Sequence, residues 1–244
     1  MKINIQSLLL VIVLTLLIFS CKKDKEETPI QETGTVTDVE GNVYKTIKIG
    51  DQWWMAENLK CTKYSNGSFI QIVSDNSEWT TTAKGAYCNY DNKTDYISTY
   101  GRLYNWFAIN DSNQLAPQGW HIATDADWKT LERELGMSEA EANTLGWRGT
   151  KEAEKLKIES PLGWTEVSPV WSNNSSGFTA LAGGCRLFNG IWSDPGLFAT
   201  GFWWTASVHD SNEAWYRYLD KKNSDIFRSH TYKNYGLSVR CVKD

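Results

Sequence analysis

The stretch from Pro117 to Gly136 constrains the fold most, because it predicts a helix with both ends marked. Thr124 occupies the N-cap position, and Asp127 three residues later can return a hydrogen bond to the cap backbone, as in a shortened capping box. Asp125 adds negative charge to the first turn, where the helix dipole favours it. Gly136 supplies the left-handed residue that ends such a helix. The sequence therefore predicts a helix between Thr124 and Gly136.

The predicted helix has an apolar face and a polar face. Apolar side chains at helical spacing form a stripe that we expect to face a core, namely Trp128, Leu131 and Leu135. The charged residues between them are expected to face water, namely Lys129, Glu132, Arg133 and Glu134. This helix is a framework element and indicates little about function.

The N-terminal residues predict export. Lys2 precedes an apolar run over residues 8–19 that is too short to span a bilayer as a stable helix. The run ends in Ser20-Cys21, which resembles a bacterial lipobox with an acylated cysteine. An ordinary signal peptide with an incidental cysteine is the alternative. Because acyl chains anchor a protein firmly, we expect an outer-membrane lipoprotein on the periplasmic or the cell-surface face. Its parts are a signal peptide (1–20), the acylated Cys21 with a flexible stalk (21–33) and a folded domain (34–244).

The folded domain is expected to be rich in strands and loops. The net charge of -4 excludes the electrostatic footprint of a nucleic-acid-binding protein. A first hairpin is predicted with its second strand over Val43–Ile49, and residues 58–99 read as long polar loops. Short helices are predicted over 100–109 and 138–146. Later strands are predicted over Gly177–Arg186, Ala199–Val208, Glu213–Asp220, Asp225–Tyr232 and Tyr235–Val242.

Short segments, in order along residues 36–244, carry a resemblance to a known family. They are Asp38–Tyr44, Trp54–Leu59, Tyr100–Trp106, Gly119–Ile122, Gly177–Leu181, Trp203–Ser207 and Ser238–Cys241. Together they resemble the Fibrobacter succinogenes major paralogous domain, a family common on exported lipoproteins. The resemblance implies an α+β, C-type-lectin-like fold, with two main helices packed on a small twisted antiparallel sheet with long loops. It implies no particular molecular activity.

Four cysteines follow Cys21, and an even number in an oxidising compartment predicts disulfides. They are Cys61, Cys88, Cys185 and Cys241. We expect pairing within each half of the chain, 61 with 88 and 185 with 241. A zinc site is the competing interpretation, but the spacing contains no CxxC pair and no nearby histidine.

No catalytic motif is present in the sequence. HExxH, GxSxG and Gly-rich phosphate-loop patterns are missing, and the histidines are scattered, at His121, His209 and His230. His121, beside the turn into the predicted helix, reads as a structural hydrogen-bond donor rather than a catalytic base. An enzyme of the formylglycine-generating type would need two thiols close together near the C-terminal end. We therefore expect a protein that is not an enzyme, with no cofactor and no metal.

A binding module for a glycan or a protein is the expected function. Trp and Tyr rings can stack on sugars, and the loops Phe188–Gly201 and His209–Glu213 lie between the later strands. The ligand-binding candidates on or beside these loops are Trp192, Asp194, Asn212 and Trp215. Calcium-dependent sugar binding has weak support, because only Trp192-Ser193-Asp194 approaches the usual pattern. The alternative is a structural or adhesion component of the envelope whose aromatic residues serve only the core.

Overall fold

The first two strands form the predicted hairpin, β1 (Thr33–Thr37) and β2 (Val43–Ile49), with Thr37 paired to Val43. The Asp38 carboxylate closes the turn by accepting hydrogen bonds from the backbone N–H groups of Glu40 (2.9 Å) and Asn42 (3.0 Å). The structure, a computed structural model, describes residues 31–159, 164, 172–193 and 196–244. All of them belong to one contact unit, Gln31–Asp244.

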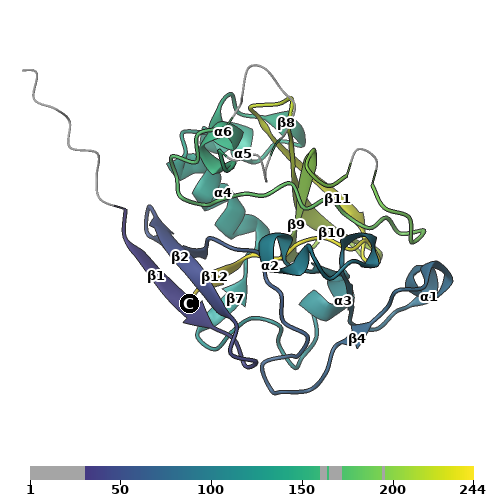
Figure 1. The fold of residues 1–244 in the computed structure, drawn as a ribbon. Coiled ribbons are helices and arrows are strands. Elements are labelled where there is room, and N and C mark those ends of the chain that lie inside the picture. The colour runs from purple at the N-terminus through teal and green to yellow at the C-terminus, as the bar shows by residue number, and fades with distance from the viewer. Residues whose placement is uncertain (1–30, 160–163, 165–171, 194–195) are drawn as a thin grey trace, which may run out of the picture. The chain divides into compact units, whose positions relative to one another are not determined.

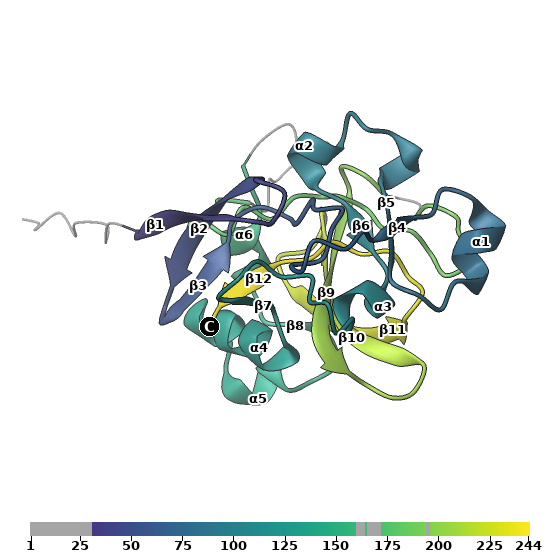
Figure 2. The same cartoon turned by 90° about the horizontal axis from the view of Figure 1, so that it is seen from below.

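Three sheets organise this unit (Figures 1 and 2). The five-stranded sheet has the order β1-β2-β3-β12-β7 and adds β3 (Gln52–Met55), β7 (Trp120–Ile122) and β12 (Cys241–Lys243) to the hairpin. The four-stranded sheet has the order β8-β11-β10-β9 and comprises β8 (Gly146–Arg148), β9 (Thr200–Val208), β10 (Glu213–Asp220) and β11 (Ile226–Tyr232). The three-stranded sheet has the order β4-β5-β6 and comprises β4 (Gln71–Ile72), β5 (Ala86–Cys88) and β6 (Leu103–Tyr104).

The helices are short. They are α1 (Asn76–Thr81), the 3₁₀ turn η2 (Tyr90–Asn92), α2 (Ile97–Tyr100), α3 (Trp106–Ile109), α4 (Asp125–Glu134), α5 (Glu139–Ala142) and α6 (Glu152–Leu156). In both views α4 and α5 lie close together, whereas α1 lies with β4 on the opposite side of the unit (Figures 1 and 2). Among the described residues, no helix is long and apolar enough to span a membrane.

The expected α+β, C-type-lectin-like fold with two main helices on a small sheet is wrong. The described residues form three sheets, and α4, with 10 residues, is the longest described helix. The second capping box does form, but α5 is 4 residues long. Gly101, with φ of 74°, interrupts the helix expected over 100–109, so that this segment divides among α2, β6 and α3. Glycine tolerates this left-handed backbone, and it allows the chain to turn away from the helix.

Other boundaries also differ from the predictions. The strands predicted over Ala199–Val208, Glu213–Asp220 and Asp225–Tyr232 correspond to β9, β10 and β11. The segment Gly177–Arg186, however, makes only isolated bridges, and Tyr235–Val242 becomes regular strand only at Cys241. The polar segment 58–99, read as loops, contains α1, β4, β5, η2 and the start of α2. Tertiary packing rather than local periodicity shapes these segments.

The α4 helix has the predicted capping box. Thr124 Oγ1 accepts from the Asp127 N–H (3.2 Å), and Asp127 accepts from the Thr124 N–H (2.8 Å). The stripe is buried as expected, since Trp128 and Leu131 are both fully buried. The Trp128 ring packs edge-on against Trp54, with centroids 5.2 Å apart. This contact joins the helix to the five-stranded sheet.

The outer face of α4 is not wholly solvated, which corrects the sequence-based prediction for Glu132. Glu132 is 0% exposed and accepts hydrogen bonds from Arg217 Nε (2.6 Å) and Arg148 Nη2 (2.8 Å). Asp125 accepts from Arg217 Nη1 (2.8 Å) and, through both oxygens, from Arg228 (2.9 and 2.8 Å). Burial would raise the pKa of Asp125, but these hydrogen bonds and charges hold it well below its usual range. Three strands of the four-stranded sheet are thus tied to α4 by buried ion pairs.

A second buried polar junction centres on Asn58. Its side-chain carbonyl accepts from Arg240 Nε (2.7 Å) and Trp203 Nε1 (2.9 Å), and its amide donates to the Tyr100 carbonyl (2.9 Å). Arg240 also donates to the Met55 and Phe178 carbonyls (2.7 and 2.8 Å). Burial lowers the pKa of Arg240 to about 9. One polar cluster therefore joins five distant segments of the chain.

Candidate functional site

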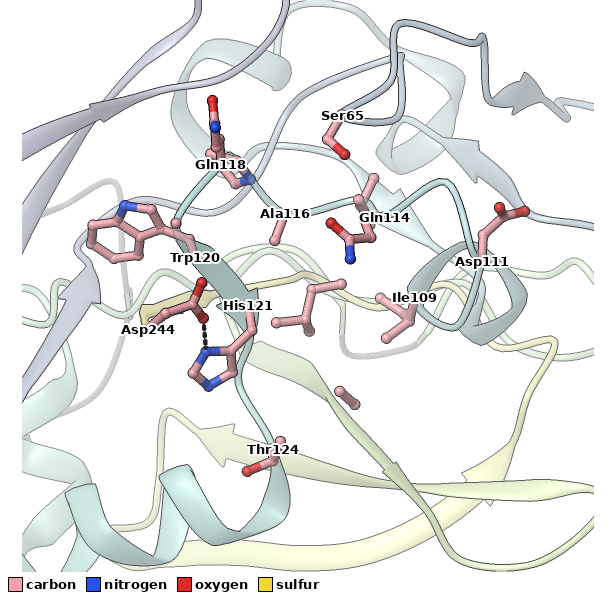
Figure 3. A pocket seen from close by; sticks show the side chains of 15 residues that line it. Ser65, Ile109, Asp111, Gln114, Ala116, Gln118, Trp120, His121, Thr124 and Asp244 are labelled. Atoms are coloured by element: carbon pink, nitrogen blue, oxygen red, sulfur yellow. Dashed lines mark hydrogen bonds and ion pairs between the residues drawn. The ribbon is translucent and has the colours of Figure 1, made fainter.

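A pocket of about 530 Å³ lies where β7 meets the segment that precedes it (Figure 3). Its apolar lining comes from Ile109, Leu115, Ala116, Pro117, Gly119, Trp120, Ile122 and Ala206. Its polar lining comes from Ser65, Asp111, Gln114, Gln118, His121, Thr124 and Asp244. This volume is within the range of small-molecule sites, which combine an apolar lining with a few polar groups. The pocket can therefore hold a small ligand that has both apolar and hydroxyl or amide surface.

His121 is held between two carboxylates at the edge of this pocket. Its Nδ1 lies 2.8 Å from Asp244 Oδ1, the contact drawn in Figure 3, and its Nε2 lies 3.1 Å from Asp127 Oδ2. The hydrogen bond to Asp127 raises the pKa of His121, against the opposing effect of burial. With both ring nitrogens engaged, the imidazole is a positioned donor, which is the role the sequence predicted for it. Because Asp127 also caps α4, the pocket wall is fixed to the start of that helix.

Gln114 and Gln118 give the pocket its free hydrogen-bonding capacity. Both residues are exposed, and within the described part of the chain neither side-chain amide has an intramolecular hydrogen bond. Each amide offers an N–H donor and a carbonyl acceptor. Asp111, on the same rim, accepts from the side-chain amide of Asn113 (2.8 Å). The rim therefore presents free amides beside carboxylates that are already engaged.

Trp192, the sharpest candidate from the sequence, lies elsewhere and is partly buried. Its ring is 5.2 Å from the Tyr90 ring, and the Arg186 guanidinium lies 5.0 Å from the Trp192 ring centroid. The same guanidinium lies 4.6 Å from the centroid of the Trp79 ring. Arg186 is fully buried and donates to the Val73, Ser74 and Gly190 carbonyls. These contacts give Trp192 a packing role, and its role in ligand binding stays a prediction.

Trp215 and Asn212 belong to a different cluster, at the β9–β10 turn. The Trp215 ring meets the rings of His209 (5.0 Å) and His230 (5.5 Å) edge-on, and Arg228 lies 3.8 Å from its centroid. The structure thus separates the candidates on the two loops instead of bringing them together. Asp194, like Cys21, lies outside the described residues.

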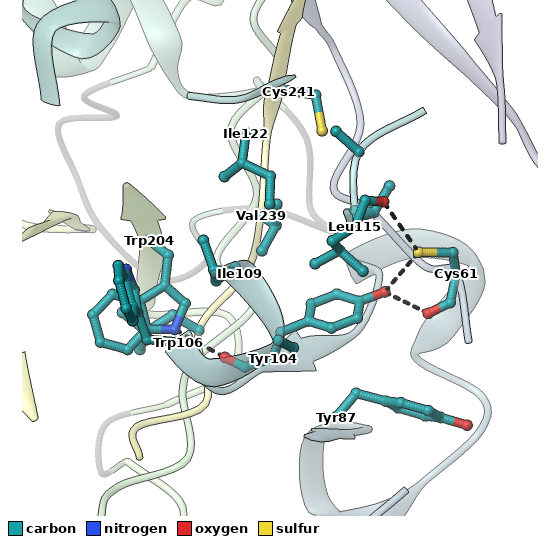
Figure 4. Packing of buried hydrophobic residues seen from close by; sticks show 14 of the residues in the cluster. Cys61, Tyr87, Tyr104, Trp106, Ile109, Leu115, Ile122, Trp204, Val239 and Cys241 are labelled. Atoms are coloured by element: carbon teal, nitrogen blue, oxygen red, sulfur yellow. Dashed lines mark hydrogen bonds between the residues drawn. The ribbon is translucent and has the colours of Figure 1, made fainter. Parts of the chain in front are cut away.

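The four cysteines of the domain are free and buried, so the predicted disulfides, 61 with 88 and 185 with 241, are not formed in the structure. Cys61, Cys185 and Cys241 belong to one hydrophobic cluster, and Cys88 belongs to another. Figure 4 shows Cys61 beside Tyr104, whose hydroxyl donates to the Cys61 carbonyl (2.7 Å). Burial raises the pKa of Cys61, Cys88 and Cys185 to about 12, so these thiols are small core groups rather than reactive ones.

The comparison with protein families agrees with the resemblance seen in the sequence. The family model of the Fibrobacter succinogenes major domain matches residues 47–243. The chain belongs to this family. Searches of the curated proteins and of the solved structures find no match.

Five of the seven segments that carry the resemblance to the Fibrobacter succinogenes major domain meet in the buried Asn58 junction. Asn58, Phe178, Trp203 and Arg240 each come from a different one of those segments, and all are buried. The family pattern in this chain therefore describes how the domain folds. The pocket lies largely between the quoted segments, since Ser65 and the stretch 109–118 supply much of its lining, although His121 and Ala206 come from two of those segments. No motif in the sequence marks this pocket, and His121 is the candidate functional residue from the sequence that lines it.

Proposed function

We propose that this protein is an exported, lipid-anchored binding module of the cell envelope, without enzymatic activity, and that its pocket takes a sugar unit of a glycan. The anchor is the acylated Cys21, which places the folded domain at the membrane surface. The pocket is the site beside His121, Gln114 and Gln118. A protein segment as ligand is the other outcome that the experiment below distinguishes.

One observation carries the proposal, namely two free amides above an apolar lining in a pocket of about 530 Å³. A sugar ring offers apolar C–H faces and hydroxyl groups that both donate and accept. Neutral side-chain amides match such hydroxyls because each amide also donates and accepts. The two carboxylate contacts of His121 support the proposal further. They fix one wall of the pocket before a ligand binds, which lowers the entropic cost of association.

A glycan array probed with residues 31–244 tests the function. We expect binding to a defined set of glycans, lost in Gln114→Ala and Gln118→Ala and retained in Gln71→Ala, an exposed amide on β4. A peptide array runs in parallel. Peptide binding with the same variant pattern would replace the glycan by a protein segment. Glycan binding that survives both pocket variants would refute this pocket as the site.

The anchor has its own test. Cys21→Ala, expressed in a Gram-negative host, should move the protein from the membrane fraction to the soluble fraction, because acylation needs the thiol. Cys61→Ala serves as the matched control and should stay with the membranes. A Cys21→Ala protein that remains membrane-bound after a carbonate wash would contradict the lipoprotein assignment.

A further inference from the structure

A cluster of two imidazoles and one carboxylate lies at the β9–β10 turn, away from the pocket lining. His209 follows β9, Glu213 begins β10, and His230 lies on β11. One ligand atom from each of these side chains lies within 4.8 Å of the others. We propose that His209, Glu213 and His230 form a binding site for a divalent transition-metal ion, with Zn²⁺ as the representative ion.

The strand register explains why residues so far apart in sequence meet. His230 pairs directly with Trp215, and Glu213 precedes Trp215 by two positions. Because side chains two residues apart on a strand share one face, Glu213 and His230 lie diagonally on the same face. Their side chains touch, with Nδ1 of His230 2.5 Å from Oε2 of Glu213. Two of the three ligands thus sit on paired strands, which are rigid supports for a metal site.

The turn between the strands places His209 over this pair. Asp210 Oδ1 accepts from the backbone N–H groups of Asn212 (2.8 Å) and Glu213 (2.9 Å), and the His209 N–H donates to the Glu213 carbonyl (3.0 Å). The His209 ring consequently stacks on the His230 ring, with centroids 3.7 Å apart and planes 6° apart. The third ligand is therefore held by the turn rather than by chance contact.

The Asp210 carboxylate contacts the His209 ring and can hold it in place. Its Oδ2 lies 3.1 Å from His209 Nδ1. Metal-bound histidines commonly use their second ring nitrogen to donate to a carboxylate, which orients the ring. The Trp215 ring meets both imidazoles from the side and forms an aromatic wall to the cluster.

The donor set selects the class of ion. Two imidazole nitrogens and one carboxylate suit Zn²⁺ and its first-row neighbours, whereas Ca²⁺ and Mg²⁺ prefer all-oxygen sites. Three protein ligands leave a position open for water or for a group from a partner. The neighbouring cations are already engaged: Arg228 pairs with Asp125, and Lys233 Nζ donates to the Asp210 and Ser211 carbonyls (both 2.9 Å). The carboxylates of Glu213 and the neighbouring Asp210 offset part of the charge of a divalent ion.

Isothermal titration of metal-free residues 31–244 with Zn²⁺ tests this site, with thermal unfolding as a second measurement. We expect one Zn²⁺ per chain and a Tm that rises with Zn²⁺, because the ion binds the folded state. His209→Ala and Glu213→Gln should each weaken binding at least about tenfold, with the metal-free Tm of His209→Ala close to that of the parent. Glu139→Gln, an exposed carboxylate on α5, should bind like the parent.

Three results would overturn the site. The first is a parent protein that takes up no Zn²⁺ at millimolar concentration. Alternatively, both variants could bind Zn²⁺ with the affinity of the parent. A third contrary result is a parent Tm that is the same with and without Zn²⁺.

Discussion

Asn58 and Arg240, 182 residues apart in sequence, meet through a buried hydrogen bond of 2.7 Å between Oδ1 and Nε. The same oxygen accepts from Trp203, so this one side chain satisfies two buried donors. Because a buried donor without an acceptor costs its full desolvation free energy, the junction specifies how the segments assemble as well as stabilising them.

The junction makes a direct stability prediction. Asn58→Ala should lower the free energy of unfolding by about 3 kcal/mol, since it leaves Arg240 Nε and Trp203 Nε1 without that acceptor. Urea unfolding measures the change. Asn110→Ala, at an exposed position directly after α3, is the control and should stay within about 0.5 kcal/mol of the parent. Equal unfolding midpoints for the two variants would contradict the junction.

The ion pairs beneath α4 make a second prediction. Arg217→Met should cost about 3–5 kcal/mol, because it removes a buried cation shared by two buried carboxylates and leaves Asp125 to Arg228 and Glu132 to Arg148. Arg133→Met removes an exposed arginine from the same helix and should have little effect. The comparison uses the same urea unfolding assay. If Arg217→Met lowered the free energy of unfolding by less than about 1 kcal/mol, α4 would be held by its apolar stripe alone.

The cysteines make a prediction opposite to the one drawn from their even number. Free thiols that are buried, with pKa values raised to about 12 at Cys61, Cys88 and Cys185, should react slowly with a thiol reagent in the folded protein and fast in denaturant. The raised values also imply that stability falls as pH increases from about 9 toward 12. Mass spectrometry of residues 31–244, alkylated in denaturant without a reducing agent, counts the thiols. Fewer than four would show that disulfides form after all.

His121 makes the domain sensitive to pH near neutrality. Its pKa is raised by the hydrogen bond to Asp127, so its contribution to stability is fully present below the ordinary value of 6.5 and is lost as pH rises through the raised value. The Tm of the parent should therefore decline over this interval relative to that of His121→Gln. Thermal melts from pH 5 to pH 9 measure the difference. Parallel curves of Tm against pH for the two proteins would show that the contacts of His121 with Asp127 and Asp244 do not depend on its protonation.

The elements predicted best are those that depend only on residues close together in the sequence. The capping box and apolar stripe of α4 and the turn at Asp38 are all encoded within a few residues. Glu132 illustrates what local patterns omit. A charged residue on a helix is normally solvated, and its burial here depends on Arg148 and Arg217, which come from strands far along the chain. The helix expected over 100–109 was wrong for a different, local reason, because the apolar periodicity continues across Gly101, where the backbone turns left-handed.

The candidate sites were harder to predict than the fold. The pocket combines Ser65, residues 109–124 and Asp244, and the proposed metal ligands are separated by 4 and 17 positions across paired strands. Neither set has a spacing that a sequence motif could reveal, because strand pairing rather than chain proximity brings the side chains together. Trp192 stood out because it lies in a turn-rich segment, but the sequence does not show the Arg186 side chain on which it packs.

Mapping of amide chemical shifts by ¹H–¹⁵N NMR, on residues 31–244 with the best glycan or peptide from the arrays, tests the central claim most directly. Binding in the pocket should shift the amides of Ser65, residues 109–124 and Asp244 and leave those of Phe188–Trp192 unchanged. Shifts confined to Phe188–Trp192 would contradict the pocket and restore the Trp192 loop as the binding face.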